Sequence, residues 1–263
     1  MGHPLVFAHR GSSYDLPEHT LAAYLRALDE GADGVECDVR LTRDGHLVCV
    51  HDRRLDRTSN GHGPVSTRTL AELEQLDFGS WHPGPAALAD GDEVLDESYL
   101  RLLTLDRLLE AVRAVSRPVR LLIETKHPSR YGRHVERRLV ALLDRHGLTV
   151  PRPDHPLQVT VMSFSLLAVR RLRMLAPTLP TVLLLDRLPR GLRLRLPFGI
   201  RIAGPGIALV RARPSLVPAL QAAGNQVYVW TVNDPSDLEL VLAAGVDGII
   251  TDRPAPTLTR LHG

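Results

Sequence analysis

Short apolar runs alternate with amphipathic helical patterns along most of the chain. β-Branched and apolar clusters predict strands at Leu5–His9, Gly34–Leu41, His46–His51, Val119–Lys126, Gln158–Phe164, Thr181–Leu185, Gly199–Ala203, Gln226–Val232 and Gly248–Thr251. Apolar residues three and four positions apart predict helices at Thr20–Glu30, Leu105–Val115, Arg133–His146, Leu166–Leu175, Ser215–Ala223 and Ser236–Ala244. This alternation predicts a parallel sheet with right-handed crossovers.

Glycine follows several of these helical patterns. We expect the left-handed cap conformation at Gly31, Gly147, Gly224 and Gly245, because glycine adopts it without steric cost. Ser236, directly after Pro235, is a predicted helix N-cap.

The strand at His46–His51 follows Gly34–Leu41 too closely for a parallel crossover, so this pair is predicted to be an antiparallel hairpin around Asp44 and Gly45. Without the returning arm, eight parallel strands remain, in a chain of suitable length for a (β/α)8 TIM barrel. A doubly wound open sheet is the second possibility. It is weakened because no glycine-rich phosphate loop follows the first strand.

The hairpin also allows a prediction of register. A two-residue loop at Asp44 and Gly45 would place Asp38 opposite His51, with Glu36 on the same face. The same register would place Cys37 and Cys49 on opposite faces, which argues against a disulfide between them.

The pattern is interrupted after the hairpin. Residues 79–96 are rich in Gly, Pro, Ala and Asp and have no clear periodicity. We therefore predict one barrel domain over residues 1–263, with an insertion at about 60–97 that contains a short helix near Thr69–Leu76. A connection of this length is usually functional or mobile.

Composition narrows the class of protein. The chain has 263 residues, 44% hydrophobic and 24% charged, which is typical of a globular protein. Its net charge of +2 argues against a nucleic-acid partner, and no apolar run is long enough for stable membrane insertion. We expect a cytoplasmic location, since the first residues do not resemble a secretion signal. Two cysteines make neither a disulfide framework nor a zinc cluster.

Acidic side chains gather where the predicted strands end, which is where a TIM barrel builds its active site. Glu36, Asp38 and Glu124 are three carboxylates on neighbouring strands. Like charges this close would raise one another's pKa unless a cation neutralises them. An all-oxygen set suits a divalent metal ion, Mg²⁺ or Ca²⁺, better than zinc.

Basic and imidazole side chains occupy the same strand ends. His9 and His51 are available as a general acid and base near neutral pH. Arg10 and Lys126 add fixed positive charge, and with a metal they would suit a phosphate. Lys126 is the single lysine among 32 basic residues, and an ammonium is not interchangeable with a guanidinium at a tight polar site.

These residues, in this order, resemble the glycerophosphodiester phosphodiesterase family. The resemblance rests on the motifs His9-Arg10-Gly11, Pro17-Glu18-His19-Thr20, Glu36-x-Asp38, Asp44-Gly45 with His51-Asp52, Glu124-x-Lys126 and Trp230-Thr231-Val232-Asn233. It covers nearly the whole chain. His19 departs from the family pattern, which usually has asparagine there.

The resemblance implies a TIM barrel that cleaves glycerophosphodiesters to sn-glycerol 3-phosphate and an alcohol, with a divalent metal. It implies that Glu36, Asp38 and Glu124 are the metal ligands and that His9 and His51 are the acid–base pair. Substrate contacts are expected from Arg10, Lys126, Trp230, Phe164 and Glu18, although Glu18 equally suits a role in holding Arg10 or capping the next helix.

Two other functions stay open. A lysophospholipase D would use the same site on lipid substrates, but residues 79–96 contain no long apolar stretch. A non-catalytic barrel that binds a phosphate ligand would have lost an acid or a histidine, and none is missing. A zinc amidohydrolase is disfavoured because no His-x-His closes the first strand. The sequence leaves the head group, the choice of metal and the oligomeric state open.

Overall fold

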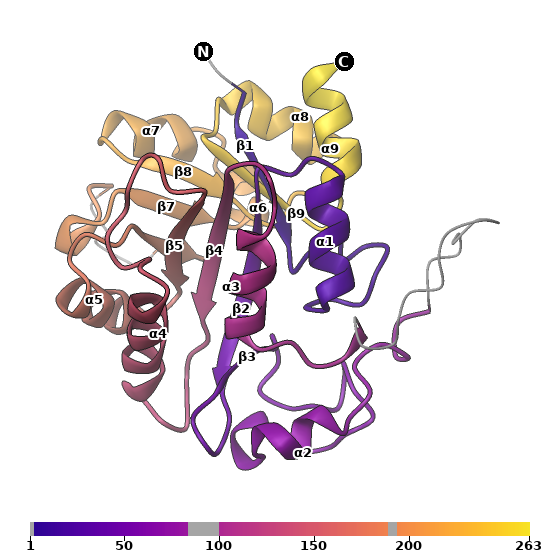
Figure 1. Cartoon of the computed structure of the whole chain (residues 1–263). Helices are drawn as coiled ribbons and strands as arrows, with labels where there is room; N and C mark the ends of the chain where they lie inside the picture. The colour runs from indigo at the N-terminus through magenta and orange to yellow at the C-terminus, as the bar shows by residue number, and fades with distance from the viewer. Residues whose placement is uncertain (1–2, 84–99, 189–193) are drawn as a thin grey trace.

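A computed structural model describes residues 3–83, 100–188 and 194–263 (Figure 1). Eight parallel strands form a closed barrel, in which β1 pairs with both β2 and β9. The barrel strands are β1 (Leu5–His9), β2 (Gly34–Leu41), β4 (Val119–Thr125), β5 (Leu157–Ser163), β6 (Thr181–Leu185), β7 (Ile202–Pro205), β8 (Gln226–Val229) and β9 (Gly248–Thr251). The predicted TIM barrel is confirmed, and closure excludes the open sheet.

Helices follow the strands and cover the outside of the barrel. They are α1 (Leu21–Asp29), α2 (Leu70–Glu74), α3 (Leu105–Arg113), α4 (His134–Arg145), α5 (Leu166–Leu175), α6 (Ile207–Ala212), α7 (Leu216–Ala222), α8 (Pro235–Ala244) and α9 (Pro254–His262), with single 3-10 turns at Val65–Thr67 and Pro197–Gly199. In Figure 1, β3 and α2 lie at the lower end, toward which β2 and β4 point, and both termini lie at the opposite end.

Most predicted elements are present within a residue or two, but the strand predicted at Gln226–Val232 already ends at Val229. The strand predicted at Gly199–Ala203 begins only at Ile202, because Phe198 and Gly199 take positive φ values of 57° and 71° in the preceding turn. The Ser236 cap is wrong, since α8 begins at Pro235 after Asp234. Helices α6 and α9 were not predicted.

The glycines expected in the cap conformation are correctly placed. Gly31, Gly147, Gly224 and Gly245 have φ values of 94°, 69°, 85° and 68°. Each lies just beyond a helix, where an L side chain would be strained.

The hairpin register differs from the prediction by one residue. Val39 pairs with Cys49 and Leu41 with Leu47 of β3 (Leu47–Cys49), and the Thr42 amide donates to the His46 carbonyl at 3.0 Å. The loop therefore holds three residues, 43–45, with Gly45 at a φ of 87°. Asp38 and His51 are therefore not directly opposed.

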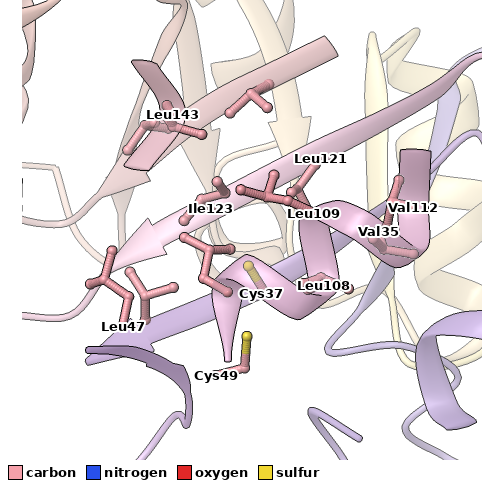
Figure 2. Packing of buried hydrophobic residues seen from close by; sticks show 14 of the residues in the cluster. Val35, Cys37, Leu47, Cys49, Leu108, Leu109, Val112, Leu121, Ile123 and Leu143 are labelled. Atoms are coloured by element: carbon pink, nitrogen blue, oxygen red, sulfur yellow. The ribbon is translucent and has the colours of Figure 1, made fainter. Parts of the chain in front are cut away.

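The shifted register also corrects the cysteine assignment. Cys37 and Cys49 both point to the outside of the barrel, where Figure 2 shows them near Leu108 of α3. Both are buried free thiols. The expected lack of a disulfide is confirmed, although the argument from opposite faces was wrong.

Apolar side chains fill the interior of the barrel below its carboxyl end. This plug consists of Phe7, Leu122, Met162, Val182, Leu184, Ile202, Tyr228 and Ile250, joined by half-buried Leu5 and Trp230. On β4, Leu122 and Glu124 share the inward face because strand side chains alternate. The plug therefore forms a dry floor beneath the acidic residues.

The segment after β3 has a small core of its own, formed by Val48, Val50, Leu55, Val65, Leu73, Phe78 and Leu102. The expected short helix is present as α2, where Thr69 and Glu72 form a capping box. Most of the irregular stretch at 79–96 lies outside the described residues. The domain boundaries and the extent of the insertion stay predictions.

Among the described residues, no helix is both long and apolar enough to cross a membrane. The cytoplasmic location stays a prediction.

Gly34 at the start of β2 is expected to tolerate no side chain. A Cβ there would lie 2.3 Å from the carbonyl oxygen of Arg120, within the barrel wall. Gly34→Ala should lower the free energy of unfolding by about 2 kcal/mol or more in urea denaturation. Gly245→Ala is the control: its Cβ would meet nothing within 4 Å, so only the left-handed strain of about 1 kcal/mol applies. Equal losses in the two variants would contradict the steric argument.

Candidate active site

Three buried carboxylates meet at the carboxyl end of β2 and β4. Asp38 is in register with Glu124 on the neighbouring strand, and Glu36 precedes Asp38 on the same inward face. One oxygen from each of the three lies within 4.8 Å of the others. The predicted acidic cluster is therefore present, and it contains only oxygen donors.

The three carboxyl groups differ in their electrostatic surroundings. Burial and the charges of Asp38 and Glu124 raise the pKa of Glu36 well above its usual range. Burial and the Asp38 charge raise the pKa of Glu124 to about 8. Burial also acts to raise the pKa of Asp38, but Lys126, His19 and Arg10 outweigh it and lower that pKa. Asp38 is thus the carboxylate that the protein's own cations keep ionised.

Lys126 and Arg10 contact Asp38 from two sides. The Lys126 Nζ lies 3.0 Å from Asp38 Oδ1 and 2.9 Å from Glu124 Oε1. The Arg10 Nε lies 3.1 Å from Asp38 Oδ2. Arg10 has a φ of 60° and Gly11 one of 89°, so the chain turns sharply after β1. Here a Cβ on Gly11 would lie 2.5 Å from the backbone of Ala23.

His19 also holds Asp38. Its Nε2 lies 2.9 Å from Asp38 Oδ2 and its Nδ1 lies 2.7 Å from the Tyr24 hydroxyl. Burial lowers the pKa of His19 and raises that of Tyr24, so both are neutral at neutral pH. The Tyr24 hydroxyl therefore donates to Nδ1, and Nε2–H donates to the ionised Asp38. The sequence did not indicate Tyr24, which lies in α1.

His9, at the end of β1, is held by a carboxylate that the sequence analysis missed. Its Nδ1 lies 2.6 Å from Asp252 Oδ1. Asp252 also accepts hydrogen bonds from Asn233 at 2.6 Å and from Ser13 at 3.0 Å. The His9 Nε2 points toward the acidic cluster, 4.0 Å from Glu36 Oε2. The available signal was an acidic residue directly after the last strand.

His51 has the same kind of support. Its Nδ1 lies 2.6 Å from Asp52 Oδ1, and the Arg40 guanidinium donates to the His51 carbonyl at 2.9 and 2.6 Å. Burial is the main cause that lowers the pKa of His51 to about 4. Because Asp52 and Asp252 accept at Nδ1, each imidazole keeps Nε2 free for proton transfer.

Two aromatic rings lie beside Lys126. Phe164 and Trp230 meet edge to face, with ring centroids 5.2 Å apart, and the Lys126 Nζ lies 6.0 Å from the Phe164 ring. The Trp230 indole N–H donates to the Gly204 carbonyl at 2.6 Å, which fixes the ring. Phe164 is 40% exposed. The structure therefore brings these predicted substrate contacts to the same end of the barrel as the acids and histidines.

Comparison with known proteins agrees with this arrangement. The sequence profile described as "Glycerophosphoryl diester phosphodiesterase family" matches residues 9–256. The chain is 51% identical over 258 residues to a probable glycerophosphodiester phosphodiesterase 1 of Mycobacterium tuberculosis, covering 97% of this chain and 92% of the relative. The chain belongs to the glycerophosphoryl diester phosphodiesterase family.

Two further proteins are similar over nearly their whole length. A glycerophosphodiester phosphodiesterase of Caldanaerobacter subterraneus is 34% identical, with 95% of this chain and 94% of the relative covered. An Oleispira antarctica phosphodiesterase, solved in complex with the product sn-glycerol-3-phosphate, superposes with a TM-score of 0.80 at 27% identity. That match covers 99% of this chain and 97% of the solved one.

In this family member, Arg57 joins the two halves of the site. Its guanidinium donates to both oxygens of Glu18, at 2.8 and 2.7 Å, and to Asp52 at 2.7 Å. Glu18 in turn accepts from Arg10 at 3.0 Å. The network thus runs from the partner of His51 to Arg10. Glu18 holds Arg10, as one of its predicted roles required, and the sequence analysis missed Arg57.

Acid should remove the stabilisation that Arg57 provides. Burial acts to raise the pKa of Glu18, but Arg57 and Arg10 lower it to about 2, and the Arg57 hydrogen bond lowers that of Asp52 to about 2. Both pKa values lie below those of the unfolded chain. The contribution is therefore complete above the unfolded values near 4 and is lost as the pH falls toward 2.

Arg57→Gln should lower the free energy of unfolding at pH 7 by about 1 to 3 kcal/mol. The difference from wild type should shrink between about pH 4.5 and pH 2 in urea denaturation. Arg54→Gln is the matched control, because among the described residues Arg54 pairs with the exposed Asp56 alone, so its loss should change little. A difference that stays constant down to pH 2 would contradict the ionic origin.

Proposed function

We propose that this chain hydrolyses glycerophosphodiesters to sn-glycerol 3-phosphate and an alcohol, with a divalent metal and the pair His9 and His51. Its family makes the chain a phosphoric diester hydrolase. The observation that carries the proposal is that three kinds of chemical group lie together at one end of the barrel. These are a buried acidic cluster, two imidazoles held by carboxylates, and two cations suited to a phosphate.

Glu36, Asp38 and Glu124 fit a divalent cation. They offer oxygen ligands only, they are buried, and three carboxylates outnumber the two nearby cations, Arg10 and Lys126. The pKa values of Glu36 and Glu124 are raised because the nearby cations do not balance the charge of the three carboxylates. We assign the three as ligands for Mg²⁺ or Ca²⁺. When bound, the ion would supply positive charge to the phosphoryl oxygens.

Arg10 and Lys126 would bind and orient the phosphodiester. Both side chains are mostly buried, and their contacts to Asp38 and Glu18 or Glu124 fix their direction. A prepositioned cation loses little freedom when it binds, so it favours the charge that develops on phosphate oxygens. The edge-to-face pair of Phe164 and Trp230 offers an apolar contact for the glycerol carbons.

His9 and His51 would transfer the protons. With Nδ1–H donated to Asp252 or Asp52, a neutral ring presents its Nε2 lone pair and a protonated ring presents an Nε2–H. One imidazole takes a proton from the attacking hydroxyl, and the other gives a proton to the leaving alcohol oxygen.

Removing either imidazole should abolish most turnover. His9→Ala and His51→Ala should each lower kcat for glycerophosphocholine about a hundredfold or more, with the fold intact by circular dichroism. The assay measures sn-glycerol 3-phosphate release, and His62→Ala at an exposed position is the control. Near wild-type turnover in either variant would overturn the assignment. Lysophosphatidylcholine in the same assay distinguishes a lysophospholipase D.

Chelation should stop the reaction and reveal the metal site independently of activity. EDTA should remove turnover, and Mg²⁺ or Ca²⁺ should restore it. The same ions should raise the Tm of the wild-type protein but not that of Glu36→Gln, because ligands that bind only the folded state stabilise it. Without metal, Glu36→Gln should be at least as stable as wild type, since it removes like-charge repulsion. A chelator-resistant enzyme would contradict the metal assignment.

A further inference from the structure

A hollow opens beside Lys126 at the carboxyl end of the barrel. About 330 Å³ of space there is not filled by protein atoms, and part of that space is open to solvent. Its polar lining comes from three separate segments: the end of β2, the chain after β3, and the loop after β4. These residues are Arg40, Arg53, Ser66, Lys126, Ser129 and Arg130.

The hollow carries an excess of positive charge. None of its lining residues is a carboxylate. Lys126 is balanced by Asp38 and Glu124, but Arg40 donates to an uncharged carbonyl, that of His51. Within the described ranges, no ion pair joins Arg53 or Arg130 to an acidic residue. Three guanidinium groups therefore face this space without a carboxylate of their own.

Lys126 relates the hollow to the substrate. Its ammonium lies 6.0 Å from the Phe164 ring, and Lys126 also lines the hollow. A phosphodiester has two ester arms that leave the phosphorus in different directions. With the phosphate at Lys126 and the glycerol arm on Phe164 and Trp230, the second arm would extend toward the hollow, because Lys126 also lines it.

We propose that this hollow is the subsite for the leaving alcohol and that it selects alcohols bearing a negative charge. The proposal rests on the phosphodiesterase function above and adds the substrate class. Guanidinium groups form paired hydrogen bonds with phosphate and carboxylate oxygens, so Arg53 and Arg130 favour a second anionic group. A quaternary ammonium such as choline would be repelled by the arginines of the hollow. The lining residues also include no aromatic side chain that could surround such a cation.

A matched pair of substrates tests the charge preference. Glycerophosphoinositol 4-phosphate and glycerophosphoinositol share one alcohol and differ by one phosphate, and glycerophosphocholine supplies a cationic arm. We expect the highest kcat/KM for the phosphorylated substrate and the lowest for the choline ester. The advantage should fall as salt rises, because screening weakens partly exposed charge pairs.

Substitution of the arginines in the hollow tests whether they cause the preference for a negatively charged alcohol. Arg53→Gln combined with Arg130→Gln should lower the ratio of kcat/KM for the phosphorylated over the plain inositol substrate about tenfold or more. The kcat/KM for glycerophosphocholine should rise, because the double variant removes two like charges from the space that the choline arm would enter. Arg137→Gln, an exposed arginine on α4 outside the hollow, is the matched control and should leave the ratio unchanged.

The outcomes separate this inference from the proposed function. If the wild-type protein hydrolyses all three substrates but the double variant keeps the wild-type ratio, the anionic subsite is wrong and the phosphodiesterase stands. A wild-type preference for choline has the same meaning. If no substrate is hydrolysed, the proposed function fails. Calorimetric binding of inositol 1,4-bisphosphate to wild type but not to the double variant would still support the subsite, and equal binding would overturn it.

Discussion

The carboxyl end of the barrel is organised around one electrostatic constraint: three buried carboxylates lie within 4.8 Å of one another. Such a cluster is unfavourable without compensating charge, and the chain supplies only part of it. Lys126, Arg10 and His19 all converge on Asp38, which keeps that group ionised while the pKa values of Glu36 and Glu124 rise. The remaining deficit of positive charge is what makes the site receptive to a divalent cation.

The same constraint explains why the surrounding side chains are so firmly held. Arg10 faces both Asp38 and Glu18, and Glu18 is held in turn by Arg57, which also holds Asp52 beside His51. The groups proposed for phosphate binding and for proton transfer are thus parts of one network. A network of this kind limits rotamer freedom, and preorganised charge is the usual source of catalytic power in phosphoryl transfer.

The local sequence pattern was sufficient to predict those elements whose conformation depends on a few neighbouring residues. The strands at Leu5–His9 and Thr181–Leu185 and the glycine caps agree with the structure because periodicity and φ preferences act over a few residues. The hairpin register was predicted wrongly, because Asp44 and Gly45 are compatible with both a two-residue and a three-residue loop. In the structure the loop is the three-residue one, and with this loop both Cys37 and Cys49 pack against the outer helices.

The sequence by itself determined the strand–helix alternation, the family resemblance and the strand-end residues that form the acidic cluster. Only the tertiary structure revealed Asp252 and Arg57, because each holds a residue from a different part of the chain. It also revealed Tyr24, which holds His19 from five positions away. His9 and Asp252 are 243 positions apart and meet only when β1 pairs with β9 and the barrel closes. Hydrogen bonding between such distant positions has no local signature, so sequence pattern identified the groups that we propose to react but not the residues that hold them.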